Sequence, residues 1–137
     1  MPYELSFTKQ FPVSDPDRYI NECCWGGDVV LERLLPGISR VFEDVSTEQE
    51  DWGWFIWFKK GEVALAVDIF CDDSTLGQFR IHLTSRKKRW LIGDSIVDLP
   101  ELEAVRELVT SEIEGWCGNP CIAERLDSKY LPLRGAV

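Results

Sequence analysis

The sequence predicts an α+β domain, in which an antiparallel sheet of about four to five strands has helices packed on one face. Three observations lead to it: strand-like alternation at several places, a hairpin pattern over residues 52–70, and a helical apolar stripe over residues 99–114. Short loops between consecutive strands favour antiparallel pairing, with the helices segregated from the strands. A chain of 137 residues fits one domain covering residues 1–137.

The first expected element is a strand over Tyr3–Thr8, where apolar and polar residues alternate with a period of two. Asp15 can cap a helix, and the proline after it tolerates the first helical position, so a helix is expected over Pro16–Trp25. Asp28 is expected to cap a second, short helix over Val29–Leu35.

Pro36 and Gly37 are expected to end that second helix. A second strand is then expected over Ser39–Val45. The stretch from Glu43 to Asp51 contains acidic residues and no basic ones, and its later part, residues 46–51, is interpreted as a solvated loop.

The segment Trp52–Phe70 is predicted to form the central hairpin of the sheet. A two-residue turn at Lys60-Gly61 would place large apolar residues opposite one another. The predicted pairs are Phe58 with Val63, Ile56 with Leu65, and Trp54 with Val67. A three-residue loop with Gly61 in a bulge would slip this register by one residue, and the first register is preferred because it separates the two faces better.

Residues 71–77 have the composition of a loop, and Gln78–Ser85 alternates again as a third strand of the meander. The basic run Arg86–Arg89 is interpreted as the exit from that strand, as a solvated hairpin end, or as a partner of the acids at 43–51. Trp90–Ile92 is expected to form a short further strand.

The clearest helical pattern covers Leu99–Glu114, preceded by a capping-box arrangement at residues 98–101. Its apolar stripe consists of Leu102, Val105, Val109, Ile113 and Trp116. Gly115 is expected to end this helix, and a last short helix is expected over Cys121–Leu126.

Charge and cysteine content restrict the classes of partner. The net charge of −9 argues against nucleic acid, which requires a cationic face, and favours a basic protein partner. No secretory signal and no membrane-spanning segment are found, so the protein is expected in the cytoplasm with no membrane partner. The five cysteines are then expected to be reduced.

The sequence lacks the familiar catalytic and nucleotide-binding motifs, which favours a protein that is not an enzyme and needs no cofactor. No metal site is expected either. Cys23, Cys24, Cys117 and Cys121 are interpreted as packing residues rather than as zinc ligands or a redox pair. Asp68, Asp72 and Asp73 could gather a hard cation, but a turn rich in solvated carboxylates explains them more simply.

The second face of the hairpin is predicted to carry the binding site. In the preferred register Trp57 lies opposite Ala64 and Phe55 opposite Ala66, so large rings face small residues and leave space above the sheet. The predicted binding residues are Phe55, Trp57, Asp68, Arg80 and His82. Rings supply contact area there, and arginine supplies a directed anchor.

These observations support two functional hypotheses. The first is a small acidic protein that binds a basic protein without catalysing a reaction, as an immunity or adaptor protein would. The alternative is a small-molecule-binding or weakly catalytic domain with a pocket near Trp57, Asp68, Arg80 and His82. A homodimer formed through an uncovered aromatic face is a third hypothesis.

Overall fold

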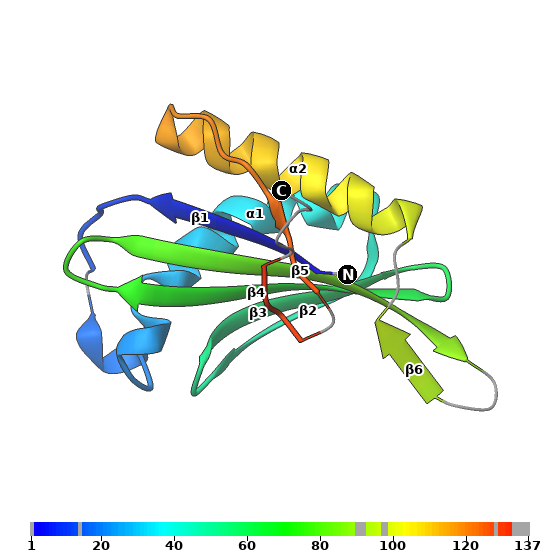
Figure 1. Ribbon diagram of the computed structural model, residues 1–137. Coiled ribbons are helices and arrows are strands. Elements are labelled where there is room, and N and C mark those ends of the chain that lie inside the picture. Colours follow the sequence, from blue (N-terminus) through cyan, green and yellow to red (C-terminus); the bar gives the residue numbers. More distant parts are fainter. Residues whose placement is uncertain (1, 14, 90–92, 97–98, 128, 133–137) are drawn as a thin grey trace.

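The computed structural model describes residues 2–13, 15–89, 93–96, 99–127 and 129–132, which contain an antiparallel sheet and two α-helices (Figure 1). The strands are β1 (Tyr3–Thr8), β2 (Glu43–Glu50), β3 (Gly53–Lys60), β4 (Val63–Asp73), β5 (Gln78–Arg89), β6 (Gly93–Ile96) and β7 (Glu124–Arg125). The helices are α1 (Gly27–Val41) and α2 (Pro100–Cys117), and two 3₁₀ turns, η1 (Pro16–Arg18) and η2 (Glu22–Cys24), precede α1.

Within these residues the strands lie in the order β2-β3-β4-β5-β1-β7, and β6 pairs with the far part of β5. All neighbouring strands are antiparallel. The predicted α+β class and antiparallel sheet are therefore confirmed, while the predicted number of strands is slightly low. In the same described ranges, no helix has the length and apolar character needed to cross a membrane.

The strand register gives the sheet two different faces. On the helix-side face, Val67 lies between Ile56 and Leu83, and all three are fully buried. Figure 1 shows α1 and α2 along this side, and Leu34 and Val109 from the two helices join the same hydrophobic cluster. The opposite face, here called the outer face, carries the alternate residues Glu4, Ser46, Glu48, Phe55, Trp57, Lys59, Ala64, Ala66, Asp68, Phe70, Arg80, His82, Thr84 and Arg86.

The predicted helix over Pro16–Trp25 is wrong, because only the 3₁₀ turns η1 and η2 form there. The Asn21 side chain accepts a hydrogen bond from the Cys23 backbone N–H at 2.9 Å, which favours a turn over a continuing helix. Ile20 is 60% exposed, so the segment buries only part of its apolar surface.

Asp28 does not cap a helix, since the N-cap of α1 is Gly26, with φ of 74°. The Asp28 carboxylate is buried; it accepts a hydrogen bond from the Tyr19 hydroxyl at 2.6 Å and forms an ion pair with Arg18 at 3.0 Å. Asp28 therefore fastens the irregular segment before α1 onto the start of that helix.

The helix α1 continues through Pro36 and extends well beyond the predicted helix Val29–Leu35. Proline inside a helix removes a hydrogen bond and costs about 3 kcal/mol. The apolar stripe of α1 nevertheless continues across it, with Leu34 and Ile38 both fully buried. Burial of this stripe against the sheet outweighs the local penalty.

The predicted strand Ser39–Val45 and the predicted loop over residues 46–51 are both wrong at their boundaries. The helix α1 includes Ser39, and β2 then runs from Glu43 to Glu50. β2 is an edge strand, and all its residues are exposed or half-buried. An edge strand needs no apolar alternation and commonly carries charges, which made this one resemble a loop.

The central hairpin is confirmed, but its turn lies at Gly61-Glu62 instead of Lys60-Gly61. Gly61 has φ of 60° at the first central position, where a type II′ turn favours glycine. The observed pairs are Phe58 with Leu65, Ile56 with Val67, and Trp54 with Ile69. The register therefore differs by two residues from the prediction, a shift that keeps every side chain on its predicted face.

The predicted strand Gln78–Ser85 is confirmed and continues as β5 to Arg89, so the basic run belongs to a strand. The prediction for Trp90–Ile92 lies outside the described residues. The predicted helix Cys121–Leu126 is wrong, because β7 forms there and pairs with the start of β1.

The predicted helix Leu99–Glu114 is confirmed, although α2 passes through Gly115 and ends at Cys117, with Gly118 as its C-cap. Gly118 has φ of 74°, and its N–H donates to the carbonyl oxygen of Glu114 at 2.8 Å. The capping box predicted at residues 98–101 is wrong, because the N-cap of α2 is Leu99 and no side chain makes a capping hydrogen bond there; Asp98 itself lies outside the described residues.

We expect Gly115→Ala to raise the free energy of unfolding by about 0.5–1 kcal/mol, because glycine inside a helix is entropically unfavourable. A methyl group at Gly115 would contact no other atom. Urea unfolding measures the effect, and Gly118→Ala is the control, expected to lower stability by about 1–2 kcal/mol because φ is positive there. If α2 instead ended at Gly115, Gly115→Ala would be the destabilising substitution and Gly118→Ala the stabilising one.

Candidate functional site

The outer face brings together all five predicted binding residues. Asp68 on β4 lies opposite Phe55 on one side and His82 on the other, so the three form one cross-strand row. Trp57 lies in the next row toward the β3–β4 turn, and Arg80 lies in the next row in the opposite direction. The observed hairpin register differs from the predicted one by two residues, and the five predicted binding residues therefore still lie on one face.

A cavity of about 290 Å³ opens on the outer face between β2 and β5. Trp57, Lys59, Ala64, Asp68, Thr84 and Arg86 are among the residues that line it. On β4 the positions beside the Trp57 ring carry the small residues Ala64 and Ala66, which leave room above the sheet. The cavity thus combines a large ring, a hydroxyl group and charges of both signs.

Trp57 is a large apolar side chain that this face leaves accessible, with 47% of its surface exposed. Its ring stacks on Phe55, with centroids 3.9 Å apart and an interplanar angle of 19°. Phe55 is itself buried, and Trp52 stacks on it in turn. The backing rings hold Trp57 in place, so a ligand that stacks on it meets a largely pre-organised surface.

Asp68 is a half-buried carboxylate beside that ring. Its burial raises the pKa of the Asp68 carboxyl above the ordinary value, and the Trp57 indole N–H, His82 and Arg86 offset only part of this effect. The indole N–H donates to Asp68 at 3.3 Å, a long hydrogen bond. Asp68 therefore retains capacity to accept a hydrogen bond from a ligand in the cavity.

We expect Asp68→Asn to stabilise the protein at neutral pH. Because the pKa of Asp68 is higher in the folded than in the unfolded chain, the folded state binds the proton more tightly, and stability falls as the pH rises between the two pKa values. Asparagine has no carboxyl group to ionise, so the variant does not lose stability in this pH range. Unfolding by urea across the acid range should show a difference between variant and wild type that grows with pH and then levels off, whereas a constant difference would contradict this origin.

Arg80 and His82 form a polar network outside the cavity lining. The Nε2 atom of His82 lies 2.9 Å from a carboxylate oxygen of Glu4, and Arg80 forms an ion pair with Asp72 at 3.2 Å. The Arg80 guanidinium also lies 4.5 Å above the Phe70 ring centroid. These side chains already have partners within the protein, so they are weaker candidates for ligand contact than Trp57 and Asp68.

The sequence prediction missed Lys59 and Arg86, which lie on either side of Ala64 in one cross-strand row. Both side chains are exposed and both line the cavity. The hairpin register contained the signal, because the turn at Gly61-Glu62 places Lys59 opposite Ala64. Arg86 was missed because the basic run was not assigned to a strand.

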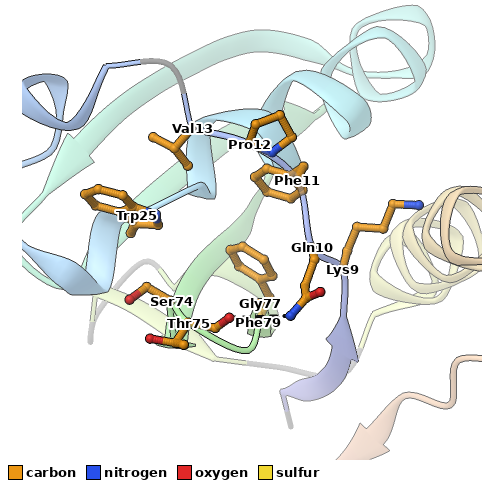
Figure 2. A pocket seen from close by; sticks show the side chains of 10 residues that line it. All are labelled: Lys9, Gln10, Phe11, Pro12, Val13, Trp25, Ser74, Thr75, Gly77 and Phe79. Carbon is orange, nitrogen blue, oxygen red and sulfur yellow. Dashed lines mark hydrogen bonds between the residues drawn. The ribbon is translucent and has the colours of Figure 1, made fainter.

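A second cavity, of about 440 Å³, lies beside the turn between β4 and β5 (Figure 2). Two of the rings that line it, Phe11 and Phe79, stack on each other at 5.7 Å. The Lys9 ammonium donates to a backbone carbonyl of α2 at 3.0 Å, and the Gln10 side chain donates to the Thr75 carbonyl at 3.4 Å. Because these groups bond within the protein, this cavity offers a ligand fewer anchors than the one beside Trp57.

The cysteines are all free thiols. Burial raises the pKa of Cys71 to about 11, and it also raises the pKa values of Cys117 and Cys121. These thiols are therefore protonated at neutral pH, which makes them poor nucleophiles and poor metal ligands. The described residues contain no group of three or more His, Cys, Asp or Glu side chains placed to hold a metal ion.

Comparison of the chain with models of protein families, with curated proteins and with solved structures finds no match. What the protein binds must therefore be inferred from the chemistry of the outer-face cavity. A fold class by itself does not define a function, whereas a site with defined geometry limits what can bind there.

Proposed function

We propose that the protein is a non-enzymatic binding protein that holds a small molecule in the outer-face cavity. The observation that carries the proposal is a half-exposed tryptophan, Trp57, beside a cavity where the neighbouring strand β4 supplies alanines in the row of Trp57 and in the next row toward the turn. A tryptophan side chain normally becomes largely buried on folding. A ring that stays accessible beside an empty cavity therefore indicates a contact with a ligand.

The dimensions and lining support a small ligand. Ligand pockets commonly measure about 300–1,000 Å³ and combine apolar surface with a few polar groups that orient the ligand. The cavity, at about 290 Å³, has a volume just below the lower limit of that range. Trp57 and the alanines supply the apolar part, and Asp68, Thr84 and Arg86 supply polar groups from two neighbouring strands.

Binding is proposed rather than catalysis because a base and a nucleophile are not paired at the cavity. Ser46 and Thr84 line it with hydroxyl groups, and within the described residues neither is hydrogen-bonded to the single histidine. His82 lies outside the lining and is engaged with Glu4. Activation of a hydroxyl group by a histidine requires a direct hydrogen bond between them.

A screen of common metabolites by thermal unfolding tests the proposal. A compound that binds the folded state raises the melting temperature, by an amount that increases with its concentration. We expect at least one compound to do so with the native protein and not with Trp57→Ala, while Trp57→Phe retains part of the shift. A shift that survives in Trp57→Ala, or a screen without any shift, would count against this site.

The acidic edge strand favours a second candidate function, docking of a basic protein. β2 carries Glu43, Asp44, Glu48 and Glu50, and its outer edge has no partner strand among the described residues. Such an edge can pair with an extended segment of another protein, and the acidic side chains together with the net charge of −9 would attract a cationic one.

The double variant Glu48→Gln/Glu50→Gln, which replaces two carboxylates of β2 with neutral amides, tests the second candidate. A basic partner captured by the native protein should dissociate as salt rises and should bind the variant more weakly, because both changes reduce the electrostatic attraction. Capture that is insensitive to salt and to the substitutions would exclude docking at β2. Light scattering at two protein concentrations detects a homodimer, in which a second copy of the chain would cover this surface instead of a basic protein.

A cytoplasmic location belongs to the same proposal. The free state of the five cysteines supports it, since reduced thiols persist in a reducing compartment.

A further inference from the structure

The side chains around the cavity beside Trp57 belong to three cross-strand rows, each with a different chemistry. Successive rows meet β4 at every second residue. The rows are Lys59–Ala64–Arg86, Trp57–Ala66–Thr84, and Phe55–Asp68–His82. Read from the β3–β4 turn, the cavity therefore offers two cations, then an aromatic ring with a hydroxyl group, and then a carboxylate.

The first row can hold an anion. Lys59 and Arg86 flank Ala64, whose methyl group leaves the space between them open. In the described part of the chain neither cation forms an ion pair. An ammonium and a guanidinium facing one space are well suited to an acidic group with several oxygens, because each can donate charge-assisted hydrogen bonds.

The second and third rows favour a flat group with N–H donors. A planar ring can stack on Trp57, and its edge can then reach Asp68, which accepts but, when ionised, cannot donate. Asp44 and Ser46 of β2 line the same cavity and can bond to hydroxyl groups of a ligand. The negative charges of Asp44 and Asp68 would also repel a polyanion that has no N–H donors to offer them.

The spacing of the rows excludes a small inorganic anion as the full ligand. Ala64 and Asp68 are four residues apart on an extended strand, a distance of about 14 Å at about 3.4 Å per residue. A phosphate or carboxylate ion can contact only one end of this span. The ligand must therefore be elongated, with its acidic group and its N–H donors at opposite ends.

We infer that the cavity binds a nucleoside monophosphate. In this assignment the phosphate contacts Lys59 and Arg86, the base stacks on Trp57, and the base edge donates to Asp68. The inference rests on the proposed small-molecule function and specifies its ligand class. A mononucleotide fits better than a nucleic acid, because a long polyanion would be repelled by a chain of net charge −9.

Isothermal titration with AMP, GMP, CMP and UMP tests this assignment, with the corresponding nucleosides and inorganic phosphate as partial ligands. We expect at least one nucleotide to bind more tightly than its nucleoside and than inorganic phosphate by about tenfold or more, since each partial ligand lacks one set of contacts. We also expect its affinity to fall as salt rises.

Two matched double variants test the position of the phosphate. Lys59→Ala/Arg86→Ala removes the two cations that line the cavity, and we expect it to weaken nucleotide binding about tenfold or more. Lys60→Ala/Lys87→Ala removes the same charge from the adjacent residues of the same strands, which both pair with Val63 and lie on the helix-side face. We expect less than about a twofold change for this control.

The base contact is tested by Asp68→Asn, which should weaken the nucleotide while leaving the weak binding of inorganic phosphate unchanged. Equal losses in the two double variants, or nucleotide binding that Trp57→Ala and Asp68→Asn do not alter, would overturn the assignment. If no nucleotide binds but another metabolite binds in a Trp57-dependent manner, this inference fails and the proposed function stands. If no compound of either set binds, both fail.

Discussion

Gly53→Ala is expected to destabilise the protein by on the order of 3 kcal/mol or more, through backbone strain and steric overlap together. Gly53 begins β3 with φ of 153°, a conformation that side-chain-bearing residues rarely adopt. A methyl group there would also overlap the carbonyl oxygen of Ile69 on β4. Because that obstacle is backbone, it can move only if the two central strands separate.

The matched control is Gly61→Ala, in the turn of the same hairpin. Gly61 also has a positive φ, of 60°, but a methyl group at this position meets no atom within 4 Å. Its expected cost is only about 1–2 kcal/mol. Urea unfolding of both variants separates strain from overlap, and equal costs would show that β3 and β4 do not approach each other closely at Gly53.

Phe58→Ala is expected to lower the free energy of unfolding by about 3–5 kcal/mol, a large part of the 5–15 kcal/mol typical of a domain. Phe58 is 2% exposed on the helix-side face, and its ring packs against Phe42 with centroids 4.8 Å apart. Alanine would leave a large cavity between the sheet and the end of α1, which the surrounding structure can fill only in part.

The neighbouring substitution, Trp57→Ala, is expected to cost only about 1 kcal/mol, from the lost stacking on Phe55. Consecutive residues of a strand point to opposite faces, so the pair compares the two faces at one position of the sheet. Chemical denaturation measures both. If Trp57→Ala destabilised the protein as much as Phe58→Ala, the assignment of Trp57 to the outer face would be wrong.

The fold class and the central hairpin could be predicted because both depend on apolar periodicity, which burial imposes directly. β1, β5 and α2 all bury one apolar stripe, and the sequence shows it. β2 could not be identified in this way, since an edge strand exposed along its length has no stripe to show. The length of α1 was missed for a related reason, because packing of Leu34 and Ile38 overrides the local effect of Pro36.

The candidate site was predictable in its face but not in its contacts. Face membership depends only on whether a position is odd or even, so Trp57 and Asp68 stayed together despite the shifted register. Contact depends on the register itself, which the conformation of Gly61 determines. Lys59 and Arg86 could therefore not be placed beside Ala64 before the turn was known.

The cavity beside Trp57 is proposed to be a binding site. Its most direct test follows the indole N–H resonance of Trp57 in ¹H–¹⁵N spectra, assigned with Trp57→Phe, while nucleotides and other metabolites are added. The Trp54 indole is the internal control, because its N–H donates to the Cys24 carbonyl at 2.8 Å and its residue lies on the helix-side face.

We expect at least one compound to shift the Trp57 resonance to a saturating value while the Trp54 resonance stays in place. A Trp57 resonance that does not respond to any compound, or a ligand that moves the Trp54 resonance and leaves the Trp57 resonance unchanged, would contradict binding in the cavity beside Trp57.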